Sequence, residues 1–284
     1  MLSALFALFV RIFSNPVANL LQKIASQKNS SLLVNLYSFL FLSLACVYPA
    51  NLCNWSGYGI EYWMYVFLAG FLCTIGSVCL IKALQIGEIS VLGPINSYKC
   101  LVGLVIGWAL LGEIPSITSF VGVLLVICGS WFIFDTVENG WKPAVLLRKE
   151  ILLRFCALIC TGCEAVILKK IILMSSIGES FILWCFSGFL FSLVLMLLFK
   201  NKFKWIFGKN LLYCLGIAVC LGLMQYSTNI VFTHLDVGLS LALFQLSGIV
   251  SVFFGYKIFK EQHLMKKIFG TVVMIVGSCF ILIY

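Results

Sequence analysis

The sequence predicts an all-α polytopic membrane protein, with ten transmembrane helices forming two inverted five-helix repeats around a central cavity. Hydrophobic residues make up 62% of the chain and charged residues 10%, whereas a soluble domain carries about a quarter charged residues. Apolar runs of about 20 residues, long enough to cross a bilayer, fill nearly the whole sequence. The stretches Gly87–Ile133 and Leu235–Ile281 also match each other without gaps at an offset of 148 residues.

The repeat rests on residues that are uncommon in so apolar a chain. The matched pairs are Glu113 with Glu261, Gly122 with Gly270, Gly129 with Gly277 and Ser130 with Ser278. We therefore divide the chain into one repeat at residues 1–139 and a second at residues 140–284. Because five is an odd number, the second repeat must enter the membrane upside down, and inverted repeats are typical of secondary transporters.

Each predicted helix is an apolar run between polar or turn residues. The runs are Leu2–Gln22, Leu32–Ala50, Tyr62–Leu84, Ile89–Leu111, Ser116–Phe134, Ile151–Met174, Ser180–Phe199, Asn210–Thr233, Val237–Phe259 and Leu264–Tyr284. Asn15–Pro16 is expected to break the hydrogen-bond ladder of the first helix. The glycines of the repeat pairs are spaced for close helix packing. Each repeated glutamate lies at a helix end just before the next helix, and the N-terminus of that next helix favours a negative charge, so we expect a structural role for both glutamates.

The basic residues give the chain a net charge of +9, but they lie at helix ends and in short loops. This placement indicates orientation in a membrane and does not indicate nucleic-acid binding. Fifteen lysines and arginines, Arg154 among them, are predicted at one membrane face and two at the other. The positive-inside rule places the richer face in the cytoplasm and both termini outside. We expect a multi-pass protein of the cell membrane, of the bacterial inner or plasma membrane type.

Three ionisable residues are predicted at mid-membrane depth: Arg11, Lys99 and Glu164. Ionisable groups inside a bilayer are costly, and they usually face a cavity and mark a substrate or ion route. In this interpretation Arg11 and Lys99 hold an anionic group, while Glu164 binds an amine or carries a coupling proton. The alternative is a static buried ion pair between Arg11 and Glu164 that fixes helix register.

Further polar residues are predicted at the same depth and complete the candidate substrate-binding set. They are Asn15, Asn19, Ser97, Tyr98, Gln225, Tyr226, Asn229 and Gln245. A mid-membrane amide can equally form an interhelical hydrogen bond without touching a substrate.

The sequence carries no recognisable catalytic motif, so we expect no enzymatic activity, no cofactor and no metal site. Cys156, Cys160 and Cys163 share one face of a predicted helix, but no histidine lies near them in the sequence. Small residues at a helix–helix contact explain this spacing better than a metal does.

Around the repeated glutamates and glycines, the segments LLGEIPSITSFVGVLLVICGSWFI and IFKEQHLMKKIFGTVVMIVGSCFI resemble the EamA family of the drug/metabolite transporter superfamily. The resemblance covers the whole chain. It implies a basket of ten helices around a central cavity that opens alternately to either side. Members of that family export amino acids and drugs, or move sugars and nucleotide-linked metabolites.

These observations lead to one main hypothesis and two alternatives. The main hypothesis is a secondary transporter, not driven by ATP, for a small polar metabolite that is amino-acid-like or an organic anion. The alternatives are a multidrug or lipid-linked metabolite exporter and a membrane scaffold without transport. The expected partners are a small-molecule substrate and membrane lipid, with no nucleic acid, and the expected assembly is a monomer or a homodimer.

Overall fold

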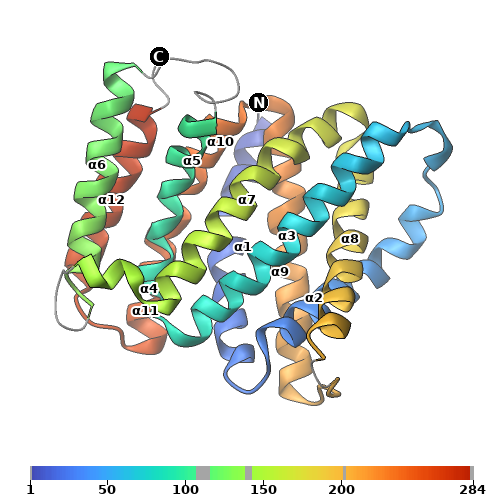
Figure 1. The fold of residues 1–284 in the computed structure, drawn as a ribbon, viewed down its shortest axis with the longest axis horizontal. Coiled ribbons are helices and arrows are strands. Elements are labelled where there is room, and N and C mark those ends of the chain that lie inside the picture. The colour runs from blue at the N-terminus through green and yellow to red at the C-terminus, as the bar shows by residue number, and fades with distance from the viewer. Residues whose placement is uncertain (1, 107–115, 138–142, 201–202, 282–284) are drawn as a thin grey trace.

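The computed structural model describes residues 2–106, 116–137, 143–200 and 203–281, which form a bundle of helices (Figure 1). The helices are α1 (Leu2–Ser26), α2 (Ser31–Ala50), α3 (Ile60–Ile86), α4 (Ile89–Leu92), α5 (Lys99–Ile106), α6 (Ile117–Phe134), α7 (Lys149–Met174), α8 (Ile177–Leu198), α9 (Lys209–His234), α10 (Val237–Phe244), α11 (Ser247–Phe259) and α12 (Leu264–Ile281), with short 3₁₀ helices η1 (Trp55–Gly57), η2 (Pro94–Tyr98) and η4 (Pro143–Leu147). Within these ranges, nine helical segments are long and apolar enough to cross a membrane, and no residue forms a strand. The prediction of an all-helical protein with helices long and apolar enough to cross a membrane is confirmed for the described residues.

Two of the predicted helices are divided. The run predicted to begin at Ile89 forms α4, η2 and α5, because Pro94 has no N–H to continue an α-helical ladder. The run Val237–Phe259 is divided into α10 and α11 by a turn. In this turn the backbone N–H of Gln245 donates to the Ala242 carbonyl at 3.0 Å. Beyond Ile106 the fourth run, with Glu113, lies outside the described residues, so the count of ten helices stays a prediction.

The first helix continues through its proline. α1 is one helix with Pro16 buried inside it. Pro16 has no backbone N–H, so the hydrogen-bond ladder lacks one donor there, as expected at Asn15–Pro16. α1 packs extensively against α9.

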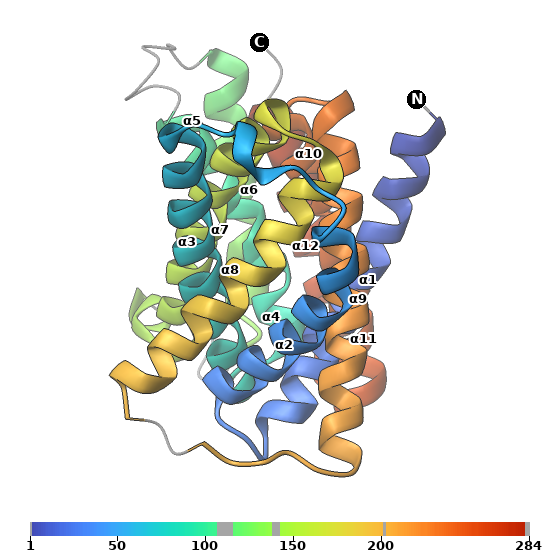
Figure 2. The same cartoon turned by 90° about the vertical axis from the view of Figure 1, so that its right-hand side faces the viewer.

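Four helix pairs make the most extensive contacts in the bundle: α6 with α12, α1 with α9, α3 with α7, and α2 with α8. The pair α6–α12 forms one edge of the bundle and the pair α2–α8 lies toward the opposite edge (Figures 1 and 2). Each pair joins a helix from the first half of the chain to one from the second half. The two halves therefore interlock along the length of the bundle.

The contact between α6 and α12 is made by the repeated glycines. A Cβ atom added at Gly122 would lie 2.6 Å from the Gly277 carbonyl oxygen, and one added at Gly129 would lie 2.6 Å from that of Gly270. No side chain fits in so short a space, so the two backbones touch directly at both points. The predicted packing role of these glycines is confirmed.

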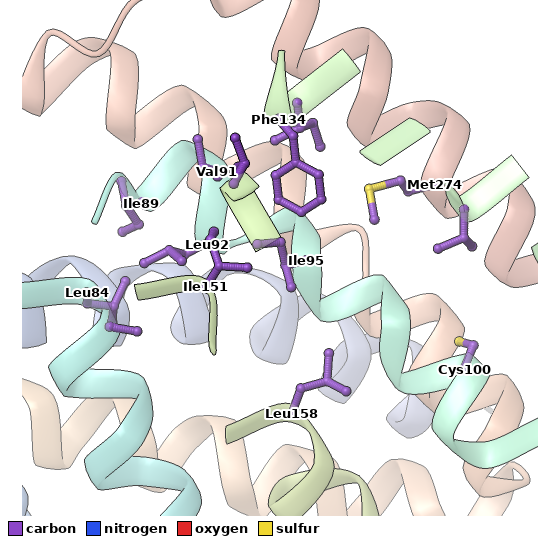
Figure 3. Close-up of a cluster of buried hydrophobic side chains, with 14 of the residues drawn as sticks. Leu84, Ile89, Val91, Leu92, Ile95, Cys100, Phe134, Ile151, Leu158 and Met274 are labelled. Atoms are coloured by element: carbon purple, nitrogen blue, oxygen red, sulfur yellow. The ribbon is translucent and has the colours of Figure 1, made fainter. Parts of the chain in front are cut away.

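Where α3, α4, η2, α6, α7 and α12 meet, a cluster of buried aliphatic and aromatic side chains fills the space (Figure 3). Its members include Leu84, Ile89, Leu92, Ile95, Phe134, Ile151, Leu158 and Met274. Burying side chains of this size contributes about 1.5–3 kcal/mol each. The cluster fixes the position of the divided segment α4–η2–α5 against α7.

Buried charges tie the helix ends together at the end of the bundle where α1 and α3 finish, which we call the basic end (lower in Figure 1). The Lys23 ammonium lies 3.1 Å from Glu261 Oε1 and donates to the Gly87 carbonyl at 2.7 Å. Glu261 also accepts from the backbone amides of Ile89 and Ser90 at 3.0 and 2.9 Å, and from the Ser90 hydroxyl. Glu261 thus satisfies the free amides at the start of α4.

A second pair completes this network. The Lys267 ammonium donates to the carboxylate of Glu88 and, at 2.7 Å, to the Ser90 hydroxyl. We call the five residues of the network the latch: Lys23, Glu88, Ser90, Glu261 and Lys267. A structural role was predicted for Glu261, but the helix that it caps is α4, in the other half of the chain, and not the following helix α12.

Candidate functional site

A cavity of about 110 Å³ lies inside the bundle and is lined by residues of α1, α3, η2, α5, α7, α8, α9 and α10. Both halves of the chain contribute to its wall. The polar lining residues are Arg11, Asn15, Asn19, Gln22, Ser77, Asn96, Lys99, Arg154, Thr161, Glu164, Gln225 and Thr228. Three aromatic rings, those of Trp184, Phe232 and Phe244, complete much of the remaining surface.

Arg11 lines the cavity from α1, as predicted from its depth in the sequence. Its side chain is 7% exposed, and its guanidinium carbon lies 3.9 Å from the centre of the Phe244 ring. The Nε and Nη1 atoms are buried and have no hydrogen-bond partner in the part of the chain that the structure describes. A buried donor without a partner is expensive, and cation–π contact with one ring offsets only part of that cost. The guanidinium charge at the wall of the cavity therefore lacks an acceptor among the described residues.

Glu164 lines the same cavity from α7 and accepts a hydrogen bond from the Trp184 indole N–H on α8 at 2.9 Å. The Trp184 ring in turn packs against Phe39, with the ring centres 4.8 Å apart. Arg11 and Glu164 share the cavity, yet no ion pair joins them within the described ranges. The alternative of a static Arg11–Glu164 pair is therefore not what the structure contains.

Arg154 corrects the sequence-based placement of the basic residues. It was predicted at the membrane face, but its side chain is 5% exposed and lines the cavity. Its Nε donates to the Leu92 carbonyl at 2.8 Å and its Nη2 to Asn96 Oδ1 at 2.9 Å. The inward position of Arg154 could have been predicted from its spacing to Thr161 and Glu164 along α7. Residues three or seven apart share a helix face, so the three side chains lie on one side of the helix.

The Arg154 contacts belong to a hydrogen-bonded chain that joins the two divided helices. The Asn96 amide on η2 donates to Gln245 Oε1 at 3.0 Å, and the Gln245 amide donates to the Leu241 carbonyl of α10 at 2.7 Å. Gln245 therefore supports the cavity wall from behind without lining it. Asn96 is a lining residue that the candidate set omitted.

Lys99 begins α5 and lines the cavity, as its predicted depth implied. Its charge is repelled by those of Arg11 and Arg154 and attracted by that of Glu164. The structure gives its ammonium no hydrogen-bond or ion-pair partner among the residues it describes. Lys99 thus shares with Arg11 an unused capacity to donate.

Three of the predicted amides also reach the cavity: Asn15, Asn19 and Gln225. Asn15 donates to the Ser247 hydroxyl at 3.4 Å, and Gln225 donates to Asn229 Oδ1 at 2.9 Å. These side chains offer neutral donors and acceptors around the four charged groups.

Besides Gln245, four predicted residues do not line the cavity. Ser97 is fully buried, and the Tyr98 hydroxyl lies 2.7 Å from Ser130 Oγ, beside α6. Asn229 donates to the Ser180 hydroxyl at 3.1 Å, which is an interhelical hydrogen bond. Tyr226 is 45% exposed and packs edge-on against Phe181 on the outside of α9. These side chains do not contact the space in which a substrate would lie in this conformation.

The cysteine cluster on α7 is explained by packing. Cys156 Sγ lies 3.7 Å from Cys79 Sγ across the α3–α7 contact, and all thirteen cysteines are free. Within the described ranges, no group of three or more histidine, cysteine or acidic side chains is arranged to hold a metal ion.

Comparisons with known proteins agree with this architecture. A solved structure, described as "Crystal structure of protein", aligns over 98% of this chain and 96% of its own, with a TM-score of 0.67 and 15% sequence identity. At that identity the likeness shows the fold alone. No curated protein matches the sequence.

The model of the EamA-like transporter family matches residues 2–135. This match confirms the resemblance over the first half of the chain, and the nine apolar helices among the described residues support a multi-pass membrane protein. Over residues 2–135, the chain is therefore similar to the EamA-like transporter family, which is part of the drug/metabolite transporter superfamily.

Proposed function

We propose that the protein is a secondary transporter that carries a small anionic or amino-acid-like metabolite through the central cavity by alternating access. The observation that supports this most directly is Arg11, a buried guanidinium with two unused donors in a cavity walled by both halves of the chain. Ionisable residues buried in a membrane protein most often mark the route of a substrate or ion.

The contacts between helices support two inverted repeats, residues 1–139 and 140–284, as the basis of this mechanism. In the repeat, α1 corresponds to α7 and α3 corresponds to α9. Exchanging each helix for its counterpart therefore converts the pair α1–α9 into the pair α7–α3, and both pairs are among the most extensive contacts in the bundle. Gly122 corresponds to Gly270, and Gly129 corresponds to Gly277. The same exchange therefore converts the contact Gly122–Gly277 into the contact Gly270–Gly129. Two units related in this way can exchange conformations and so open one cavity to either side in turn.

The lysines at the two ends of the bundle repeat the same contact. Lys23 donates to the Gly87 carbonyl at 2.7 Å at the basic end, and Lys169 donates to the Leu235 carbonyl at 3.0 Å at the other. Leu235 follows Gly87 by 148 residues, which is the repeat offset, and Lys169 follows Lys23 by 146 residues. In the proposed cycle these contacts form and break as the divided helices α4–η2–α5 and α10–α11 move.

A wider hollow of about 580 Å³ lies at the basic end and is lined in part by the latch residues Lys23, Glu88 and Glu261. None of its lining residues also lines the central cavity. In the proposed cycle, release of the latch would join the two spaces and open the cavity toward that end.

The size of the cavity favours a small metabolite over the exporter alternative. Pockets that bind drug-sized molecules have volumes of about 300–1,000 Å³, whereas this cavity has about 110 Å³. A drug or a lipid-linked metabolite would need a much more open conformation. The scaffold alternative gives no reason for three basic groups in one buried cavity.

The proposed setting is the cell membrane of a bacterium, with the basic end in the cytoplasm and both termini outside. Moving Arg154 from the membrane face to the cavity leaves fourteen of the fifteen basic residues assigned to that face, so the bias remains. A reporter that is active only in the cytoplasm, fused after Tyr284, should be silent. Activity of that fusion would reverse the orientation.

The transport proposal is tested with purified protein in liposomes, by measuring uptake of labelled amino acids and organic anions by the wild type and Arg11→Ala. Losing hydrogen bonds to a charged group costs about 1.5–3 kcal/mol, so uptake of the substrate should fall at least about tenfold. Arg11→Lys should recover part of it, because lysine keeps the charge and loses the planar fork. The exposed Lys257→Ala serves as the control and should transport normally. Uptake of no compound by the folded wild type would support a scaffold instead.

A further inference from the structure

The central cavity has an uneven set of charges. Arg11, Lys99 and Arg154 are basic and Glu164 is acidic, so three positive charges against one negative leave a net charge of +2. All four residues lie in membrane-spanning helices or the divided segment beside them, where water cannot freely screen them.

Among the described residues, no ion pair neutralises these four charges. None of the five ion pairs formed by the described residues includes any of the four. Arg154 donates to a backbone carbonyl and an amide oxygen, both neutral, and Glu164 accepts from the neutral indole of Trp184. Arg11 Nε and Nη1 have no acceptor among the described residues, and no described residue accepts a hydrogen bond from Lys99.

From this arrangement we infer that the cavity selects a small dianion, with one anionic group on Arg11 and the second toward Lys99. This inference rests on the proposed transport function and narrows its substrate class. A zwitterion would leave the net charge of the occupied cavity at +2, and a monoanion would leave it at +1. Only a dianion brings it to zero, and unbalanced charge is expensive where water is excluded.

The four residues then have distinct roles. The Arg11 guanidinium lines the cavity, and its positive charge can pair with an oxygen of a carboxylate or a phosphate group. Lys99 supplies a point charge for the second group. Arg154 is held by Leu92 and Asn96, so it contributes charge from a fixed position. Glu164 sets the capacity of the cavity at two negative charges and repels a third.

The test changes the charge of the cavity one step at a time. Binding to purified protein is measured calorimetrically for glutamine (zwitterion), butyrate (monoanion), succinate (dianion) and tricarballylate (trianion) at pH 7.5. Glycerol 3-phosphate, as a second dianion, distinguishes a phosphate monoester from a dicarboxylate. The wild type should bind at least one of the two dianions at least tenfold more tightly than butyrate or glutamine.

Lys99→Gln lowers the net charge to +1 and should weaken binding of the dianion at least tenfold while changing butyrate binding less than threefold. Glu164→Gln raises the charge to +3 and should strengthen tricarballylate binding at least tenfold. Both variants are near in size to the original side chains, and Lys99→Arg, which keeps the charge, should retain dianion selectivity. Lys257→Gln removes an exposed lysine outside the cavity and should change nothing.

The outcomes separate this inference from the transport proposal. Preference for glutamine or butyrate by the wild type would overturn the dianion inference while supporting a transported metabolite. Selectivity that does not follow the charge in the two variants would also overturn it. Binding of none of the five probes, with no uptake in liposomes, would overturn both.

Discussion

The latch at the basic end and the central cavity use the same kinds of charged residue in opposite ways. In the latch, Glu261 accepts from an ammonium, two backbone amides and a hydroxyl. In the cavity, Arg11 is equally buried and leaves two donors unused. Burial alone therefore does not distinguish the structural charge of Glu261 from the binding charge that we propose for Arg11. The two side chains differ in the number of their hydrogen-bond partners among the described residues.

The largest expected effect of a substitution is at the centre of the latch. Glu261→Ala should lower the free energy of unfolding by about 3–5 kcal/mol, because it leaves the buried lysine without its counter-charge and the first amides of α4 without an acceptor. Denaturant unfolding in detergent micelles measures the change. Glu61→Ala is the control, since Glu61 is exposed and bonds only the Tyr65 hydroxyl among the described residues. If Glu261→Ala lowers the free energy of unfolding no more than Glu61→Ala does, the latch does not stabilise the fold.

Acid should weaken the latch without any substitution. Burial by itself raises the pKa of the Glu261 carboxyl, but the Lys23 ammonium and the hydroxyl and amide of Ser90 outweigh it, so the pKa lies below the ordinary value of 4.5. A carboxyl with a lowered pKa stabilises the fold at pH values above its ordinary pKa, and this contribution is lost as the pH falls through the folded-state value.

The measurement is the difference in unfolding free energy between the wild type and Glu261→Gln across the acidic range. The difference should be constant from pH 7 to about pH 5.5 and should shrink below about pH 4.5. Other carboxyl groups titrate in both proteins and cancel. A difference that grows on acidification would mean that the pKa of Glu261 is raised in the folded protein.

A smaller effect on stability is expected in the cavity. Arg11→Met removes a buried charge without an acceptor, at the cost of its contact with Phe244. The free energy of unfolding should fall by less than about 1 kcal/mol, since buried charges are often replaced by apolar groups without loss. Substrate uptake should nevertheless be abolished.

Lys23→Met provides the matched comparison in the latch. It removes a basic residue from the same helix, α1, but one with a carboxylate and a carbonyl as partners. It should destabilise the fold by about 3 kcal/mol or more, because Glu261 remains buried. Equal losses for the two variants would contradict the distinction drawn between the two regions.

The smallest effect is expected for the exposed ion pair at the other end of the bundle. Lys169 lies 3.5 Å from Asp236, whose side chain is 97% exposed. Water screens such a pair, and surface pairs contribute little. Asp236→Asn should leave the thermal midpoint unchanged within error, and a clear decrease would show that this end is also held by charge.

The sequence predicted the architecture better than the site, for a physical reason. Apolar length and the repeated glycines report local requirements, namely crossing a bilayer and bringing α6 against α12, and both are confirmed at the level the structure tests. The position of a side chain around a helix is harder to predict. Gln225 reaches the cavity while its neighbour Tyr226 faces outward, because successive residues are about 100° apart on a helix.

Arg154 shows what single-helix reasoning cannot supply. It lies five residues after the start of α7, where the sequence suggests the membrane face. Its partners come from Leu92 and Asn96, some sixty residues earlier in the chain, on a segment predicted to be one regular helix. The 3₁₀ turn after Pro94 directs Asn96 toward Arg154 and Tyr98 toward α6. Only the folded arrangement of that segment brings the arginine inward.

The glycine contacts between α6 and α12 have a consequence for the evolution of this fold. They consist of main chain against main chain, and no described residue of either helix lines the cavity. Substitutions that change the charge or shape of the cavity therefore need not disturb this contact. Substrate preference and the joining of the two halves can vary independently, which leaves the cavity free to acquire new specificities while the bundle keeps its form.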